Sequence, residues 1–266
     1  MVIRLFLAEW GHLKEATKLY KQQEALCKEL GDKVGLSKSL DYQADILADR
    51  GQLKEAMKLY TQQEALCKEL SDRAGLSRSL GNQALILYAW GRLEEAMKLH
   101  KKEEALYKEL DDKAGLSRSI GNQALILKAW GRLQESMQVH KQEEAIYKEL
   151  GDKAGLSRSL GNQALILRAW DRLQESMQLH KQEEALYKEL GDKAELAMSL
   201  FNQARLLSDK MNRPKEALSL AEEAYHLAKD NHFNILAQQI KPILVSIRLR
   251  HFLNRLNQFW KELRHK

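Results

Sequence analysis

Three histidines, His100, His140 and His180, recur at intervals of 40 residues, and histidine is the residue type here that most readily suggests chemistry. Zinc needs histidine nitrogens at about 2 Å from one centre. Equivalent residues of stacked helices lie at least about 8–10 Å apart. Tyrosine also takes the same place at positions 20 and 60. We therefore expect no metal site and a packing role for these histidines.

Two cysteines and a recurring pair of glutamates are the other candidates for catalysis. Cys27 and Cys67 share one position of the repeat with tyrosines, so we expect half-buried packing residues whose thiols stay free. Glu103 and Glu104 recur in nearly every copy, and Glu104 lies four residues before Lys108, as on a solvated helix face. The sequence has no phosphate-binding glycine loop, nucleophile elbow or metal-ligand cluster. We expect no enzyme activity and no cofactor.

Arginine and asparagine occur four residues apart in three successive copies, a spacing that places both on one helix face. Arginine offers a fork for a carboxylate, and asparagine offers a donor and an acceptor to an extended backbone. Asparagine is a mediocre helix former, so its presence inside three helices indicates a structural hydrogen bond or a ligand contact. The pairs are Arg78 with Asn82, Arg118 with Asn122, and Arg158 with Asn162.

These residues belong to an internal repeat of 40 residues. Segment 81–120 recurs at 121–160 with 31 of 40 positions identical, and 33 of 40 are identical between that copy and 161–200. Such identity exceeds what packing requires and indicates recent duplication or design. Two divergent copies precede these at 1–40 and 41–80, and a sixth begins at residue 201. A period of this length predicts stacked units that share one core.

Each copy holds two helices. In the copy around residue 121, Asp112 is placed to cap a first helix, and Ile120, Ala124 and Leu127 follow at helical spacing. Gly131 then separates this helix from a second one. Only 2 prolines occur, and strong helix formers dominate the composition. We predict an all-α protein, a right-handed α-solenoid of stacked helix-turn-helix repeats.

The domain organisation follows from the repeat. We expect a repeat array over residues 1–240, six copies with the first one truncated, and a C-terminal capping helix over 241–266. In this helix Leu244, Ile247, Phe252 and Trp260 would form the packed apolar face, and the arginines would keep the outer face wet. End units of a repeat array need such a polar outer face.

Charge and hydropathy limit the kinds of partner that the protein can be expected to bind. The net charge of +6 comes from 43 basic and 37 acidic residues that are interspersed along the helices, so a nucleic-acid partner is disfavoured. No apolar run reaches the roughly 18 residues that span a membrane, and no membrane partner is expected. The first residues lack the basic region and cleavage site of a signal peptide. A cytoplasmic protein is the expectation.

The stretch Gly121 to Leu133, GNQALILKAWGRL, resembles a tetratricopeptide repeat, with most similarity to the long repeats of kinesin light chains and near-identical bacterial arrays. Small residues that the family uses for close packing match Ala84, Ala124 and Ala164 in first helices and Ala96 in a second helix. Ser136 and Ser176 substitute for the latter. The chain departs from the family at Glu103, Glu143 and Glu183, where a second small residue is usual, and only Ala224 restores it. This departure puts the tight packing of the second helices in doubt.

The resemblance implies a function, because the family binds peptides in a concave groove lined by first helices. We therefore expect a non-catalytic scaffold for a protein or peptide ligand. Two alternatives stay open: the sensor region of a larger signalling protein such as a nucleotide-driven switch, and a nucleic-acid-binding solenoid. The residues that the resemblance places in the groove are Arg78, Asn82, Leu85, Arg118, Asn122, Leu125, Arg158, Asn162 and Leu165.

Overall fold

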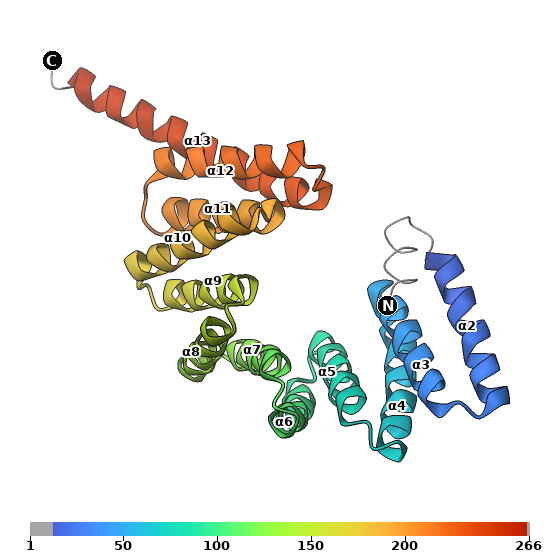
Figure 1. The fold of residues 1–266 in the computed structure, drawn as a ribbon. Coiled ribbons are helices and arrows are strands. Elements are labelled where there is room, and N and C mark those ends of the chain that lie inside the picture. The colour runs from blue at the N-terminus through green and yellow to red at the C-terminus, as the bar shows by residue number, and fades with distance from the viewer. Residues whose placement is uncertain (1–12, 265–266) are drawn as a thin grey trace. The chain divides into compact units, whose positions relative to one another are not determined.

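The computed structural model describes residues 13–264, which form helices joined by short turns, with no strand in that range. The chain divides into two compact units, one up to Val139 and one from His140, and α8 spans the division. The predicted all-α array of stacked helical hairpins is confirmed (Figure 1). The helices are α2 (Leu13–Leu30), α3 (Lys33–Asp49), α4 (Leu53–Glu69), α5 (Arg73–Ala89), α6 (Leu93–Glu109), α7 (Lys113–Ala129), α8 (Leu133–Leu150), α9 (Lys153–Ala169), α10 (Leu173–Leu190), α11 (Lys193–Asp209), α12 (Pro214–Asp230) and α13 (Asn234–Arg264).

Aspartates begin the first helix of each hairpin. The Asp112 carboxylate accepts a hydrogen bond from the Gly115 amide at 2.8 Å, as predicted, and Asp72 and Asp152 do the same for Gly75 and Gly155. These bonds satisfy amides that have no partner within the helix. Gly131 follows α7 with a φ of 74°, the left-handed conformation that ends the helix. The caps and turns therefore fix where each hairpin starts and bends.

Neighbouring hairpins are joined by two recurring hydrogen bonds, one buried and one partly buried. A serine of each first helix donates to a carbonyl of the preceding second helix, for example Ser79 to Tyr60 at 2.8 Å and Ser159 to His140 at 3.1 Å. A glutamine four residues further on donates to a glutamate of that same second helix. The glutamine–glutamate distances are 2.7–2.8 Å for Gln43–Glu24, Gln83–Glu64, Gln123–Glu104, Gln163–Glu144 and Gln203–Glu184. Together the two bonds set the register of each first helix on its predecessor.

Small side chains line the contact inside each hairpin, as the resemblance implies. Ala84, Ala124 and Ala164 are completely buried, and so is Ala96. Ser136 and Ser176 are also completely buried, and their hydroxyls donate to the carbonyls of Ala124 and Ala164 at 2.7 and 2.8 Å. The serines therefore keep the close approach that alanine allows and satisfy their own polar group.

The large Glu103 side chain fits because the first helix opposite it has a glycine. A Cβ atom added to Gly81 would lie 2.3 Å from Glu103 Oε1, and the same holds for Gly161 and Glu183. In the last hairpin the sizes are exchanged, and Phe201 packs in one cluster with Ala224. The glutamates therefore do not loosen the second helices, because a compensating small residue lies on the first helix.

The C-terminal helix α13 differs from the predicted cap. Leu244 and Ile247 are buried against α11 and α12, as expected, but Phe252 and Trp260 are exposed at 57% and 56%. The expected packed face therefore ends near Ile247, since the C-terminal part of α13 extends beyond α12 (Figure 1). Arg248 and Arg255 are exposed, as expected, but Val245 and Leu249 are exposed as well, so the outer face of this helix is mixed and not uniformly polar. Residue 241, the expected start of this helix, lies within α13.

None of the helices in residues 13–264 is both long enough and apolar enough to cross a membrane.

Candidate functional site

The first helices of the hairpins share an accessible face, the first-helix face. In the N-terminal unit this face has a hollow, and five of the predicted groove residues line it. Its volume is about 350 Å³. Arg78, Asn82 and Leu85 reach it from α5, and Arg118 and Asn122 reach it from α7. The structure thus brings together residues of two successive repeats that are 40 positions apart in sequence.

Four side chains that the sequence analysis did not assign to the groove also line this hollow, three of them acidic. Asp41 and Asp45 come from α3, and Glu103 and Tyr107 come from α6. Asp41 and Asp45 belong to a divergent copy in which the 40-residue pattern has different side chains, so the search for recurring residues missed them. The hollow therefore combines cationic, anionic and amide groups.

The remaining predicted residues lie at the equivalent positions of α7 and α9. Leu125 lies on α7 and is half-buried. Arg158, Asn162 and Leu165 lie on α9 in the C-terminal unit, where the arginine is exposed and the other two are half-buried. All nine predicted residues are therefore at least partly accessible: the three arginines and Leu85 are exposed, and the other five are half-buried.

The three arginines of this face have no acidic partner. Within residues 13–264 no ion pair joins Arg78, Arg118 or Arg158 to a carboxylate. The arginines of the turns behave differently, since each donates through Nε at 2.6 Å to the glutamate three residues later. These turn residues are Arg92, Arg132, Arg172 and Arg213. The guanidinium groups of the first-helix face are thus left available to a ligand.

The asparagines differ between copies. The Asn82 amide donates to Asp45 Oδ1 at 3.4 Å, and the Tyr60 hydroxyl donates to the same oxygen at 2.5 Å. The repeat places Leu85 where Asp45 stands one copy earlier, so Asn122 lacks that acceptor. No hydrogen bond joins the side chain of Asn122 or Asn162 to another residue of the described range. Asn82 is therefore partly structural, whereas Asn122 and Asn162 keep free amide groups.

The recurring histidines are buried packing residues, as expected. His100, His140 and His180 are at most 1% exposed, and each Nδ1 lies 2.7–2.8 Å from a glutamate oxygen three residues later. Within the described range no three histidine, cysteine or acidic side chains gather as metal ligands. Nδ1 of each ring thus serves a buried pair inside a second helix, whereas Nε2 of each ring is buried without a hydrogen-bond partner in the described chain.

The glutamate pair was expected to form a solvated helix face, and this expectation is wrong. Glu103 is only 6% exposed and is bound to His100. Glu104 is partly buried and accepts from Lys108 at 2.5 Å and from Gln123 at 2.7 Å. Burial raises the pKa of the Glu104 carboxyl, but the bonds from Lys108 and Gln123 outweigh it and the net pKa is lowered. Spacing alone revealed the lysine pair but not the glutamine on the next helix.

The cysteines are free thiols, as predicted, but they are more buried than expected. Cys27 is 7% exposed and Cys67 is completely buried, with Ser37 Oγ 3.4 Å from the Cys67 sulfur. Burial raises the pKa of both thiols. A buried thiol with a raised pKa is a poor nucleophile.

These features define a helical repeat array with an accessible cationic and amide-bearing face, and solved structures share its fold. It is similar to a STAND protein with a tetratricopeptide repeat sensor from Pyrococcus horikoshii, at 14% identity and a TM-score of 0.76, over 94% of this chain and 38% of that one. The near-identical TPR-like repeats of a kinesin light chain from Podosopora anserina match at 21% identity and a TM-score of 0.57, over 71% and 93%. The Rap conjugation gene regulator of plasmid pLS20, in complex with the Phr* peptide, matches at 13% identity and a TM-score of 0.68, over 80% and 59%.

The fold is therefore that of TPR-like repeat proteins, in agreement with the resemblance seen in the sequence. No family model and no curated protein matches the chain.

Proposed function

We propose that this chain is a non-catalytic scaffold that binds an acidic segment of a protein or peptide along its first-helix face. The observation that carries the proposal is the set of three exposed arginines, Arg78, Arg118 and Arg158, that have no acidic partner in the described chain. An arginine that forms no ion pair gains a charge-assisted, bidentate bond when a carboxylate reaches it. Arg78 and Arg118 line one hollow of the N-terminal unit from two successive repeats, which favours a ligand that extends over both repeats.

The neighbouring side chains suit an extended peptide. The free amides of Asn122 and Asn162 each offer a donor and an acceptor to a peptide backbone. Leu85 lines the same hollow as Arg78 and Arg118, exposes 46% of its surface and offers an apolar contact. The hollow of about 350 Å³ lies in the size range of ligand sites. The Rap regulator bound to the Phr* peptide supports the idea that this fold can hold a peptide.

Selection from a phage-displayed library of random 12-residue peptides tests the proposal. We expect the wild-type protein to enrich peptides that are rich in aspartate and glutamate. A triple variant with Arg78→Ala, Arg118→Ala and Arg158→Ala should bind an enriched peptide at least about tenfold more weakly, since a charged hydrogen bond contributes about 1.5–3 kcal/mol. Its affinity should also depend less on salt concentration.

The matched control removes three arginines of the turns by Arg92→Ala, Arg132→Ala and Arg172→Ala. These residues already hold glutamates, and their loss changes the net charge by the same amount. The proposal requires that this control binds like the wild type. Equal losses in both triple variants would show only a general charge effect, and a library without acidic enrichment would contradict the proposal itself.

A further inference from the structure

The first-helix face changes its chemistry in α11. At two positions where earlier copies agree, this helix has different residues: Glu195 replaces the glycine found at 75, 115 and 155, and Met198 replaces the arginine found at 78, 118 and 158. The exchange removes a cation and adds an anion and an apolar side chain. This part of the face therefore cannot bind the same acidic group as the preceding copies.

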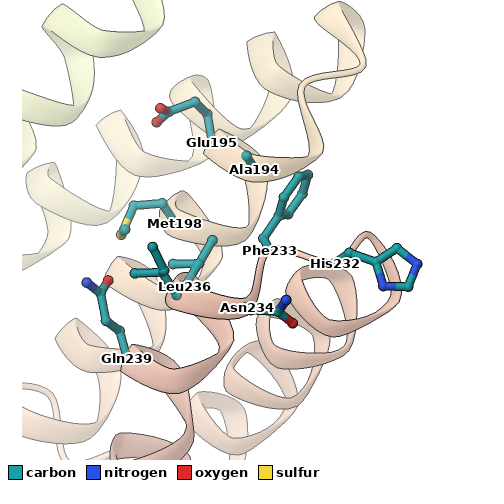
Figure 2. Close-up of a pocket in the computed structure, with 9 residues that line it drawn as sticks. Ala194, Glu195, Met198, His232, Phe233, Asn234, Leu236 and Gln239 are labelled. Atoms are coloured by element: carbon teal, nitrogen blue, oxygen red, sulfur yellow. The ribbon is translucent and has the colours of Figure 1, made fainter. Parts of the chain in front are cut away.

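A hollow of about 520 Å³ opens beside these two residues, between α11 and the start of α13. Met198 lines it from α11, and Phe233 and Leu236 line it from the segment that enters α13 (Figure 2). The three side chains pack against the buried cluster that contains Leu200, Phe201 and Ile240. The hollow thus has an apolar floor held by the core of the C-terminal unit.

Polar groups lie at the rim of this hollow. Figure 2 shows Glu195 of α11 and Gln239 of α13 on the same side of it as Met198. Within the described range, no ion pair or side-chain hydrogen bond joins the Glu195 carboxylate to another residue. Burial, and after it Asp192 and Glu183, raise the pKa of this carboxyl, while Arg158 lowers it. A cation placed beside Glu195 would add to the compensation that Arg158 provides and would favour the charged carboxylate.

Glu195 also lies in the first turn of α11, where an acidic residue stabilises a helix by itself. That local role explains why a glutamate occurs at position 195, but it explains nothing else about the hollow. It explains neither Met198 nor the open apolar floor, which would be better covered if no ligand entered it.

We infer that the hollow between α11 and α13 is an anchor site for a large apolar side chain of the ligand, with a lysine or arginine of the same ligand beside Glu195. The inference rests on the proposed function, because the ligand is the same peptide segment. It adds that the ligand is not uniformly acidic: in the C-terminal unit an acidic part meets Arg158, and a basic, apolar part meets α11.

The same 12-residue phage library, selected on Met198→Arg and on Glu195→Gln, tests the inference. Met198→Arg restores the residue that three other copies carry, so it suits the fold. We expect the wild type to enrich peptides that combine acidic residues with a large apolar residue next to lysine or arginine. Met198→Arg should lose the apolar preference and bind a wild-type-selected peptide roughly 10- to 100-fold more weakly, the usual effect of burying one large apolar side chain.

Glu195→Gln should keep the apolar preference and lose the adjacent basic residue. Val245→Arg is the control, since it adds the same charge at an exposed position of α13 outside the hollow, and it should bind like the wild type. The anchor site would be overturned if the wild type selected acidic peptides that lack the apolar and basic residues, or if Met198→Arg selected peptides that still have them. Either result would leave the proposed function intact. Absence of any enriched peptide would instead contradict the proposed function.

Discussion

Replacing Gly81 by alanine tests the packing of the middle hairpins. Helix propensity alone predicts that Gly81→Ala stabilises the protein by about 0.5–1 kcal/mol, because glycine is a poor residue inside a helix. The structure predicts the opposite sign. The new Cβ atom would lie 2.3 Å from Glu103 Oε1, and Glu103 is buried and bound to His100 at 2.7 Å.

Accommodating the methyl group requires Glu103 to move. An overpacked core position costs about 1–3 kcal/mol, and a weakened bond to a buried carboxylate costs about 1.5–3 kcal/mol if it is lost. The carboxylate end of the side chain is flexible, so we take the lower part of these ranges and subtract the gain in propensity. The expected net loss is about 1–2 kcal/mol in the free energy of unfolding, measured by urea denaturation followed by circular dichroism.

A double-variant cycle identifies the cause. Gly81→Phe with Glu103→Ala copies the pair Phe201 and Ala224 that the last hairpin already uses. The double variant should be more stable than Gly81→Phe alone by about 1–3 kcal/mol, the coupling expected of residues in contact. A stabilising Gly81→Ala, or additive effects in the cycle, would refute the idea that glycine makes room for the glutamate.

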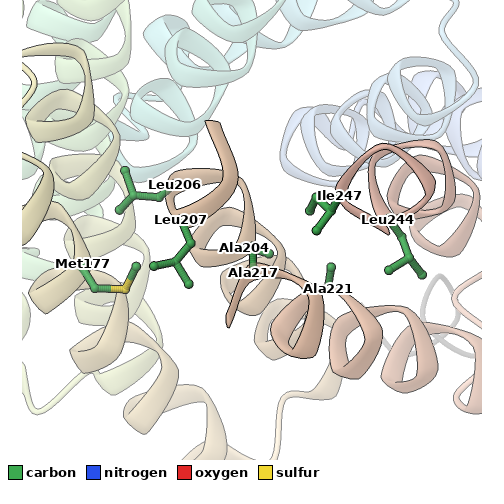
Figure 3. Close-up of a cluster of buried hydrophobic side chains, with 8 residues drawn as sticks. All are labelled: Met177, Ala204, Leu206, Leu207, Ala217, Ala221, Leu244 and Ile247. Atoms are coloured by element: carbon green, nitrogen blue, oxygen red, sulfur yellow. The ribbon is translucent and has the colours of Figure 1, made fainter. Parts of the chain in front are cut away.

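Three further predictions follow from the contacts described above. Deleting residues 242–266 removes Leu244 and Ile247 from their cluster with Ala221 (Figure 3) and should lower the melting temperature. Deleting 251–266 instead removes a segment whose apolar side chains, such as Phe252 and Leu253, are exposed, and should leave the melting temperature unchanged; equal melting temperatures for both truncations would contradict this. Burial is the main cause that raises the pKa of Tyr187 to about 12, so the stability that its proton contributes is complete below pH 10 and is lost as the pH rises toward 12. Tyr187→Phe should therefore reduce the slope of the unfolding free energy against pH between 10 and 12. An unchanged slope would show that Tyr187 is not responsible. Asn122→Ala should change the unfolding free energy by less than about 0.5 kcal/mol and weaken peptide binding, and a loss above about 1 kcal/mol would assign Asn122 a structural role instead.

Much of the fold could be predicted from the sequence because each copy of the repeat carries the same capping, turn and core residues at the same positions. Asp112, the turn at Gly131 and the buried Ala124 are each visible as residue types at fixed spacing, and the structure confirms them. The partners across helices could not be predicted. Nothing within one helix indicates that Glu104 meets Gln123, or that Gly81 faces Glu103, because these contacts depend on the packing of one helix on another.

The candidate site was predictable where the copies agree and was missed where they differ. Arg118 and Asn122 stand out because they recur, and both line the hollow of the N-terminal unit. Asp45 and Met198 occur once each at their positions, so a search for recurring residues passes over them, although both alter the chemistry of the same face. The end of α13 was misjudged for a different reason: its apolar spacing indicates a buried face, but the body of the unit does not reach that far.

Photo-cross-linking of a library-selected peptide tests the central claim most directly, because it reports the binding face without a substitution in the protein. The peptide would carry a benzophenone side chain at each position in turn, and the adducts would be located by mass spectrometry. The account predicts adducts on the first helices α5, α7, α9 and α11, at or next to the positions of Arg78, Arg118, Arg158 and Met198. Adducts confined to the second helices, or to the exposed outer face of α13, would contradict it.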